Sequence, residues 1–447
     1  MDFVKLLWEK IENKIHTIPA LIAGVLILLI IFLTSDTFFS KYIPINYLKY
    51  IYLVLPILWV FYWLHNRFWI SKNDKNHTGL VICINADTDD AEQILKRDFV
   101  SSVKKQITNE NVGELFNIIV VKNHLASKYN DLKSIHRLHN KVKGHIYIFG
   151  ETKKRNNGGK EQYFLSLDGM VLHRPVPQQV SQELAKDFLS TLPKGINFND
   201  EFAFVGFQVS ADIVVKSVKY IVGLAAYISG NPTLAISLHT NLKNQIVSSP
   251  QKLPGDNLIL SKIDGLLANE YAIMSAYYFG KQDKENTNLN LTEALRLNPN
   301  CYRALIVESI VAFSWENDPK KSLIITKKCH GFNYPEWKYN EAFLYFWLGN
   351  YPSALKQCEK IKTQNYPNEL TTSLEVTTFN ESIIANDPSR PALYFWIGYN
   401  YYYKQDNLPL ALKYFELFER NATQQMSKMK QKSTAWLIEI KRKMEIK

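Results

Sequence analysis

The chain carries none of the short motifs that usually mark a catalytic or cofactor site. It has no G-x-x-x-x-G-K-[ST] loop, no G-x-G-x-x-G after a strand, and no H-E-x-x-H, C-x-x-C or G-x-S-x-G. Such motifs place backbone amides around a phosphate, ligands around a metal, or a serine nucleophile beside its partners. We therefore expect no catalytic residue, no metal site and no cofactor, and three polar clusters remain to be interpreted.

The first cluster is acidic and consists of Asp87, Asp89 and Asp90. Carboxylates in a group are ligands that Mg²⁺ accepts. Acids at the start of a helix also oppose its dipole and cap its amides. Because an expected helix begins here, capped by Asp87 or Thr88, we favour the capping interpretation.

The second cluster contains four histidines, and two of them, His136 and His139, fall on one face of an expected helix. A zinc site needs converging ligands and partners that orient them. The sequence specifies neither, so we interpret these histidines as surface residues. The other two are His124 and His145.

The third cluster is basic and flanks an expected hairpin turn at 156–159. Positive charge gathered at a turn is suited to a phosphate or a nucleotide, whereas an exposed hairpin with solvated cations is the alternative. We therefore predict possible ligand contacts at Lys153, Lys154, Arg155 and Lys160.

Short strands and amphipathic helices alternate from Gly79 onward, which predicts an α/β domain over residues 76–195. Asn-Asn-Gly-Gly at 156–159 tolerates positive φ, so the strands on either side of it should be antiparallel. The expected strands are 79–85, 116–121, 144–150 and 161–169, and the expected helices are 87–107, 132–140 and 180–192.

This order of elements, with the sequence from Val142 to Gly150 at the third strand, resembles the small α/β domain shared by the TolB amino-terminal and CsgG-like families. Those families usually have Pro-Phe where this chain has Asn85-Ala86. The resemblance implies a regulatory or ligand-binding domain, often joined to helical repeats. It brings no catalytic residues.

The segment Tyr345–Ile361 is similar to the tetratricopeptide repeat, with small residues Ala342, Gly349 and Ala354 where paired helices approach closely. Segments 220–242 and 392–420 repeat this layout. The resemblance implies an all-α solenoid of TPR-like repeats over 213–425, following a linker at 196–212. The small positions in the two other segments are Gly223, Ala235, Gly398 and Ala411.

Two apolar runs precede these domains, and the first, 18–33, contains no charge. A helix needs about 20 apolar residues to cross a bilayer. We therefore expect a transmembrane α-hairpin within residues 1–75, with spans at about 18–34 and 50–66. Basic residues outside the pair exceed those in its loop, which predicts cytoplasmic termini and, in bacteria, an inner-membrane location.

Charge and composition narrow the function further. The 447 residues include 53 basic and 42 acidic ones, a net charge of +11, and four cysteines without a close pair. The basic residues are spread along the chain and then concentrated in a capping helix expected at 426–447, so nucleic acid is an unfavoured partner. The cysteines indicate a reducing compartment.

These features together predict a membrane-anchored scaffold whose repeat groove binds a protein partner. The bilayer would be its second partner, and a homo-oligomer is left open. One alternative is a sensor-effector, for example in bacterial defence, whose transmembrane hairpins disturb the membrane on activation. The other is an enzyme with a site that no motif reveals.

Overall fold

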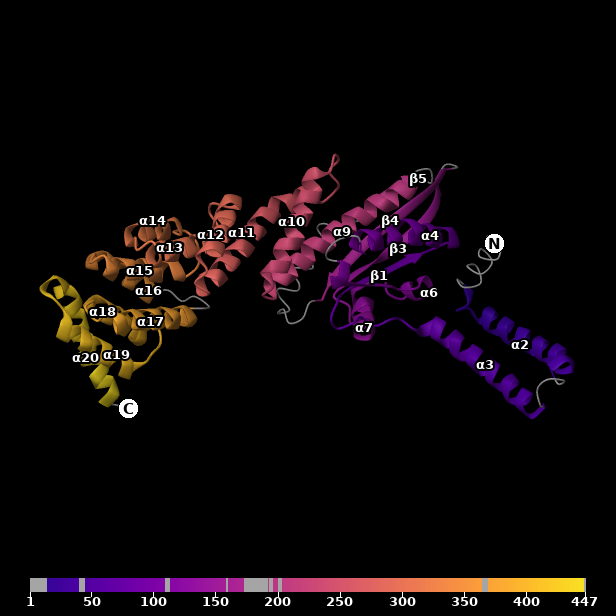
Figure 1. Ribbon diagram of the computed structural model, residues 1–447, viewed down its shortest axis with the longest axis horizontal. Coiled ribbons are helices and arrows are strands. Elements are labelled where there is room, and N and C mark those ends of the chain that lie inside the picture. Colours follow the sequence, from indigo (N-terminus) through magenta and orange to yellow (C-terminus); the bar gives the residue numbers. More distant parts are fainter. Residues whose placement is uncertain are drawn as a thin grey trace. The chain divides into compact units, whose positions relative to one another are not determined.

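The computed structural model describes residues 14–39, 45–108, 113–157, 160–172, 192, 196–199, 203–363 and 369–445 (Figure 1). The chain forms two compact units. One contains Met1–Ser229 and Asn241–Leu260, and the other contains Gly230–Thr240 and Ser261–Lys447. Each unit is considered by itself.

A mixed sheet of five strands in the order β2-β1-β3-β4-β5 forms the centre of the first unit. β1 pairs in parallel with both β2 and β3, whereas β3–β4 and β4–β5 are antiparallel. The expected strands 79–85 and 161–169 fall within β1 and β4, the expected strands 116–121 and 144–150 overlap β2 and β3, and β5 lies in the segment expected to be a linker. The strands are β1 (Thr78–Ala86), β2 (Phe116–Val120), β3 (Ile146–Asn157), β4 (Lys160–Val171) and β5 (Ile196–Asn199).

Helices cover both faces of this sheet. Alternate residues of β1 point to opposite faces, and Val81 and Cys83 join a buried cluster with Ile135 and Leu138 of α7 (Leu132–Val142). On the β4 strand, the ring of Tyr163 packs against Phe207 of α9. α9 (Ala203–Ile228) runs through the expected linker, and the other helices here are α4 (Asp89–Ile94), a π-helical turn (Leu95–Val100), α5 (Ser101–Thr108) and α6 (Asn123–Ala126).

Two helices precede the sheet, α2 (Ile18–Phe39) and α3 (Ile45–Phe68), and they pack as a pair. The indole nitrogens of Trp59 and Trp63 donate hydrogen bonds to the carbonyls of Leu21 and Thr17, at 3.2 and 2.9 Å.

The expectation that this pair spans a membrane is wrong. Within the described ranges, the structure contains no helix with enough length and apolar character for a membrane crossing. The uncharged run at 18–33 is shorter than the roughly 20 residues a span needs, and α2 continues with Thr34, Ser35 and Asp36. The two-pass topology and the location inferred from it therefore lose their basis.

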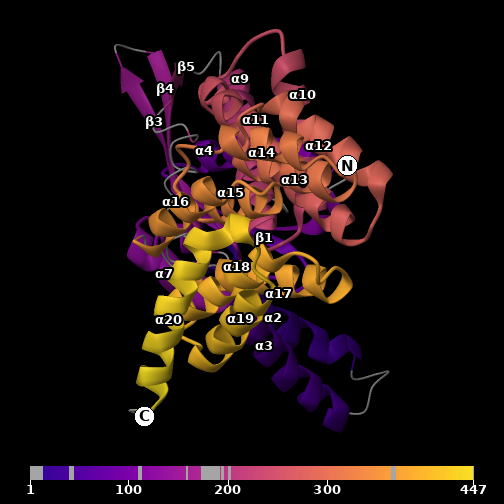
Figure 2. The ribbon, with the colours of Figure 1, turned by 90° about the vertical axis from the view of Figure 1, so that its left-hand side faces the viewer.

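The second unit consists of helices. Consecutive helices contact each other in the pairs α13–α14, α15–α16 and α18–α19, and α20 packs on α19 (Figure 2). The helices from α10 onward are α10 (Pro232–Ser248), α11 (Asp256–Gly280), α12 (Lys284–Leu297), α13 (Tyr302–Ser314), α14 (Pro319–Lys328), α15 (Glu336–Trp347), α16 (Tyr351–Lys362), α17 (Glu369–Asn386), α18 (Pro391–Tyr403), α19 (Leu408–Asn421) and α20 (Ser427–Glu445). The second half of α10 and the start of α11 belong to the first unit, which includes Asn241–Leu260.

The small residues singled out in the sequence lie at a turn, at a close helix contact or in the buried core. Gly349 has φ +76° at the turn between α15 and α16, a conformation that favours glycine. A Cβ atom on Gly398 would lie 2.9 Å from a ring carbon of Phe415, so α18 and α19 meet closely there. Gly223 is buried in α9, and the fully buried alanines are Ala235, Ala342, Ala354 and Ala411.

The basic C-terminal helix packs with its apolar side on the preceding pair. Met429 and Ile440 of α20 are fully buried, and Trp436 packs against the same core. Three of its lysines pair with glutamates of neighbouring helices: Lys430 with Glu419 at 3.9 Å, Lys432 with Glu359 at 2.8 Å and Lys441 with Glu416 at 3.2 Å.

Candidate functional site

A cavity of about 670 Å³ opens in the first unit at the carboxyl ends of β1 and β2. These strands are parallel neighbours, so their ends meet at one edge of the sheet. Open α/β sheets bind their ligands at this edge. The lining comes from four separate segments: residues 14–17; Asn66; Asn85, Asp89, Glu92 and Lys96; and residues Lys122, Asn123, His124 and Ser127.

Asn123 fixes the geometry of one wall. Its Oδ1 accepts a hydrogen bond from the amide of Ala86 at 2.7 Å, and its Nδ2 donates to the carbonyl of Ala86 at 3.0 Å. The same Nδ2 donates to Glu92 Oε2 at 2.9 Å. One side chain after β2 thus joins the end of β1 to the helix that follows it, and Glu92 is held in place.

Three lysines bring positive charge to the cavity from different parts of the chain. Lys14 lies 3.2 Å from Asp89, and Lys96 lies 2.5 Å from Glu92. The ammonium group of Lys122 donates to the carbonyl and side-chain oxygens of Asn66, at 3.3 and 2.9 Å. Both cations and carboxylates therefore line the cavity.

Two histidines complete the wall between the N-terminal segment and the sheet. The rings of His16 and His124 stack with their centroids 3.8 Å apart and their planes 5° apart. His124 Nε2 lies 3.2 Å from the carbonyl oxygen of Arg67, to which it donates. Burial, together with the charge of His16, lowers the pKa of His124 to about 4. The His124 ring is therefore neutral near pH 7.

The residues before α2 belong to this site because the two N-terminal helices hold them there. The guanidinium of Arg67 donates to the carbonyl of His16 at 3.3 Å, and Trp63 donates to that of Thr17. Sequence reasoning missed the cavity because it treated residues 1–75 as an anchor apart from the α/β domain. The available signal was the polar run Lys14, His16 and Thr17 directly before an apolar helix.

The predicted ligand contacts on the β3–β4 hairpin lie elsewhere and contact side chains of the hairpin and of α4. Lys153 pairs with Glu151, and Lys154 lies 2.8 Å from Glu161 and 3.4 Å from Asp90. The hydrogen bond to Glu161 raises the pKa of Lys154 above its usual range. Arg155 lies over the ring of Phe164, 5.4 Å from its centroid, and the side chain of Lys160 lies outside the described residues. None of the three described cations lines the cavity.

The other polar clusters are dispersed. Thr88, rather than an aspartate, caps α4 by accepting from the amide of Ala91 at 3.2 Å, and Asp89 faces the cavity. His139 contacts the hydroxyl of Tyr147 at 3.0 Å, and His145 Nδ1 accepts from the amide of Gly79 at 2.9 Å. No group of three His, Cys, Asp or Glu side chains in the described ranges is placed to hold a metal ion.

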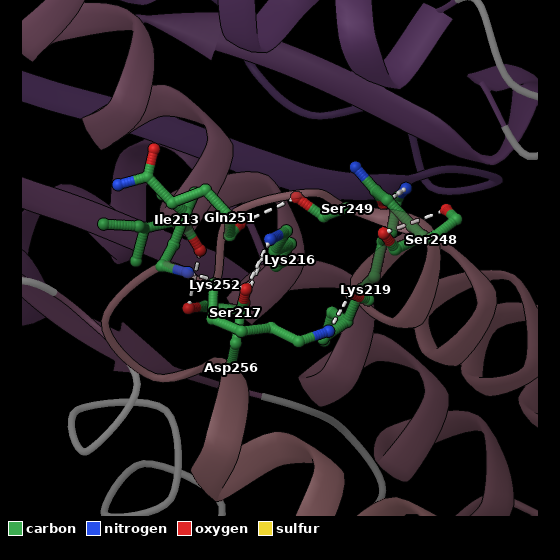
Figure 3. Close-up of polar contacts among 12 residues, drawn as sticks. Ile213, Lys216, Ser217, Lys219, Ser248, Ser249, Gln251, Lys252 and Asp256 are labelled. Atoms are coloured by element: carbon green, nitrogen blue, oxygen red, sulfur yellow. Dashed lines mark hydrogen bonds and ion pairs between the residues drawn. The ribbon is translucent and has the colours of Figure 1, made fainter.

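A separate group of polar side chains is buried at the junction of α9, α10 and the start of α11 (Figure 3). Lys216 donates to both carboxylate oxygens of Asp256, at 3.0 and 2.9 Å, and the two side chains are 5 and 1% exposed. Lys219 donates to Gln245 Oε1 at 2.8 Å. Asp256 also accepts from the amide of Leu253 at 2.9 Å. This cluster joins three helices.

Comparison with known proteins assigns no family to the chain. No family model matches it, and no curated protein matches it. The similarities to tetratricopeptide repeats and to TolB amino-terminal domains remain predictions.

Proposed function

We propose that this protein is an interaction scaffold whose helix stack binds a protein partner and whose α/β unit binds a small polar ligand that regulates it. The observation that carries the proposal is the series of helix pairs α13–α14, α15–α16 and α18–α19. Stacked pairs bury a continuous core between neighbours and present an extended outer surface, which such proteins use to bind partners.

Apolar side chains on the surface of the stack support a binding role. Leu370 and Leu374 lie one turn apart on α17, on the same face, and are 56 and 48% exposed. Exposed apolar side chains that lie together are typical of protein contact sites. The α17 face is therefore where we expect the partner to bind.

Affinity purification of the full chain, followed by binding measurements with the recovered and purified partner, tests this role. Changing Leu370 and Leu374 together to serine should weaken binding at least tenfold without lowering the melting temperature. Leu289→Ser is the matched control, because Leu289 is 66% exposed on another helix, α12. Equal affinity of the wild type and the double variant would contradict the assignment of the α17 face.

The alternative of a membrane-disturbing effector is not retained. It required transmembrane hairpins, and the helices that the structure describes include none that is long and apolar enough to form one. No contact in the described residues favours an enzyme over a binding protein.

A further inference from the structure

Among the residues that the structure describes, lysines outnumber carboxylates in the lining of the cavity at β1 and β2. The lysines are Lys14, Lys96 and Lys122, and the carboxylates are those of Asp89 and Glu92. The neutral His124 ring adds no charge near pH 7. The lining therefore favours an anionic ligand over a cationic one.

The two ion pairs at this site differ in how firmly they are held. Lys14 and Asp89 are 66 and 76% exposed, and exposed pairs contribute little to stability. Lys14 is therefore able to exchange Asp89 for a stronger acceptor at low cost. Glu92, in contrast, is 17% exposed and is also held by Asn123, so it stays with Lys96.

We propose that this cavity binds a phosphate-bearing small molecule of nucleotide size, with Lys14 and Lys122 contacting its phosphates. A phosphate carries up to about two negative charges and strong acceptor oxygens, which lysine ammonium groups bind as point charges. The volume of about 670 Å³ lies within the range of small-molecule sites. This inference rests on the ligand-binding half of the proposed function.

The remaining lining suits the rest of such a molecule. Asn66 and Asn85 offer amides, and Ser127 offers a hydroxyl, near the lysines. Amides and hydroxyls both donate and accept hydrogen bonds, as a sugar or a base requires. The lining of the cavity thus contains both cationic and neutral polar side chains.

Isothermal titration of the full chain with ATP, AMP, pyrophosphate and inorganic phosphate, each in EDTA, tests the proposal. We expect at least ATP to bind, with an affinity that falls as salt is raised. Binding of the nucleotides alone would show that base and sugar are needed, and binding of pyrophosphate as well would show that phosphate suffices. Failure of all four probes to bind at millimolar concentration would overturn the proposal.

Substitutions of single lysines test whether ATP binds in this cavity. Lys122→Gln and Lys14→Gln should each weaken ATP binding at least tenfold with an unchanged melting temperature in the absence of ligand. Lys153→Gln, on the β3–β4 hairpin, should bind as the wild type does. Loss of binding in Lys153→Gln alone, or unchanged binding in Lys122→Gln, would overturn the assignment to this cavity.

Hydrogen exchange gives a second readout. ATP should slow exchange at the amides of residues 14–17, because these residues form a wall of the cavity. Unchanged exchange there, with ATP bound, would place the ligand elsewhere. Failure of these experiments is distinguishable from failure of partner binding, since Leu370 and Leu374 lie in the other unit.

Discussion

The α9–α11 junction and the cavity at β1 and β2 both contain a lysine–aspartate pair, but in opposite surroundings. Lys216 and Asp256 are 5 and 1% exposed, whereas Lys14 and Asp89 are 66 and 76% exposed. A charge buried with its partner has no water to replace that partner. The closed pair therefore maintains the fold, while the open pair is available to a ligand.

The largest loss of stability is expected from Lys216→Ala, which breaks the closed pair. Removing the lysine leaves the Asp256 carboxylate buried without its cation, which typically costs about 3–5 kcal/mol. Urea unfolding of the full chain measures the loss. Replacing both residues by leucine should recover part of it, and a loss below about 1 kcal/mol in the single variant would show that the pair is not closed to solvent.

Two glycines differ in the same way, because one lies in a close helix contact and the other has open space around it. Gly398→Ala adds a methyl group 2.9 Å from the ring of the fully buried Phe415 and should destabilise the second unit by about 1–2 kcal/mol. Gly265→Ala is the control, because no atom lies within 4 Å of its added Cβ. That variant should be stabilised by about 0.5–1 kcal/mol through helix propensity. Thermal unfolding measures the change in stability of both variants. Equal changes would contradict a close α18–α19 contact.

The His124 ring predicts a moderate dependence of stability on pH. Its pKa is about 4 in the folded chain and 6.5 in the unfolded chain, so the unfolded chain binds the proton first. The contribution of His124 to the free energy of unfolding is fully present above about pH 6.5. It falls as the pH drops from there toward 4. The effect is moderate because the ring is only partly buried beside Lys122 and Lys128, whose charges also lower its pKa.

Urea midpoints at pH 7.5 and 5.0, for the wild type and His124→Gln, measure this dependence. The variant should lose less stability between the two pH values. An identical loss in both proteins would show that His124 is already solvated in the folded state.

The smallest effect on stability is expected at the open pair. Lys14→Gln should change the free energy of unfolding by less than about 1 kcal/mol, as exposed ion pairs usually do. A larger loss in urea unfolding would mean that Lys14 holds the N-terminal segment in place, and the contrast with Lys216 would weaken.

Local patterns predicted the sheet better than they predicted the sites. Alternation and the turn residues at 156–159 located β3 and β4, because both depend on neighbours in the sequence. The small residues Ala342 and Ala354 were found in the same way, and both are buried.

The sites depend on contacts between distant residues, which no local pattern encodes. The Lys216–Asp256 pair joins residues 40 positions apart, and Trp63 reaches Thr17 across 46. Lys216 and Lys219 of α9 are buried, and the sequence alone does not indicate this. The apolar run 18–33 predicted a membrane span from composition, although its length fell short.

The most direct test of the account is to measure ATP affinity and melting temperature together in Lys14→Gln and Lys216→Met. Both temperatures are read without ligand, and both affinities are measured below the lower melting temperature. The account predicts that Lys14→Gln loses affinity at least tenfold and keeps its melting temperature, while Lys216→Met melts earlier and keeps its affinity. Loss of affinity in Lys216→Met with wild-type affinity in Lys14→Gln would contradict it.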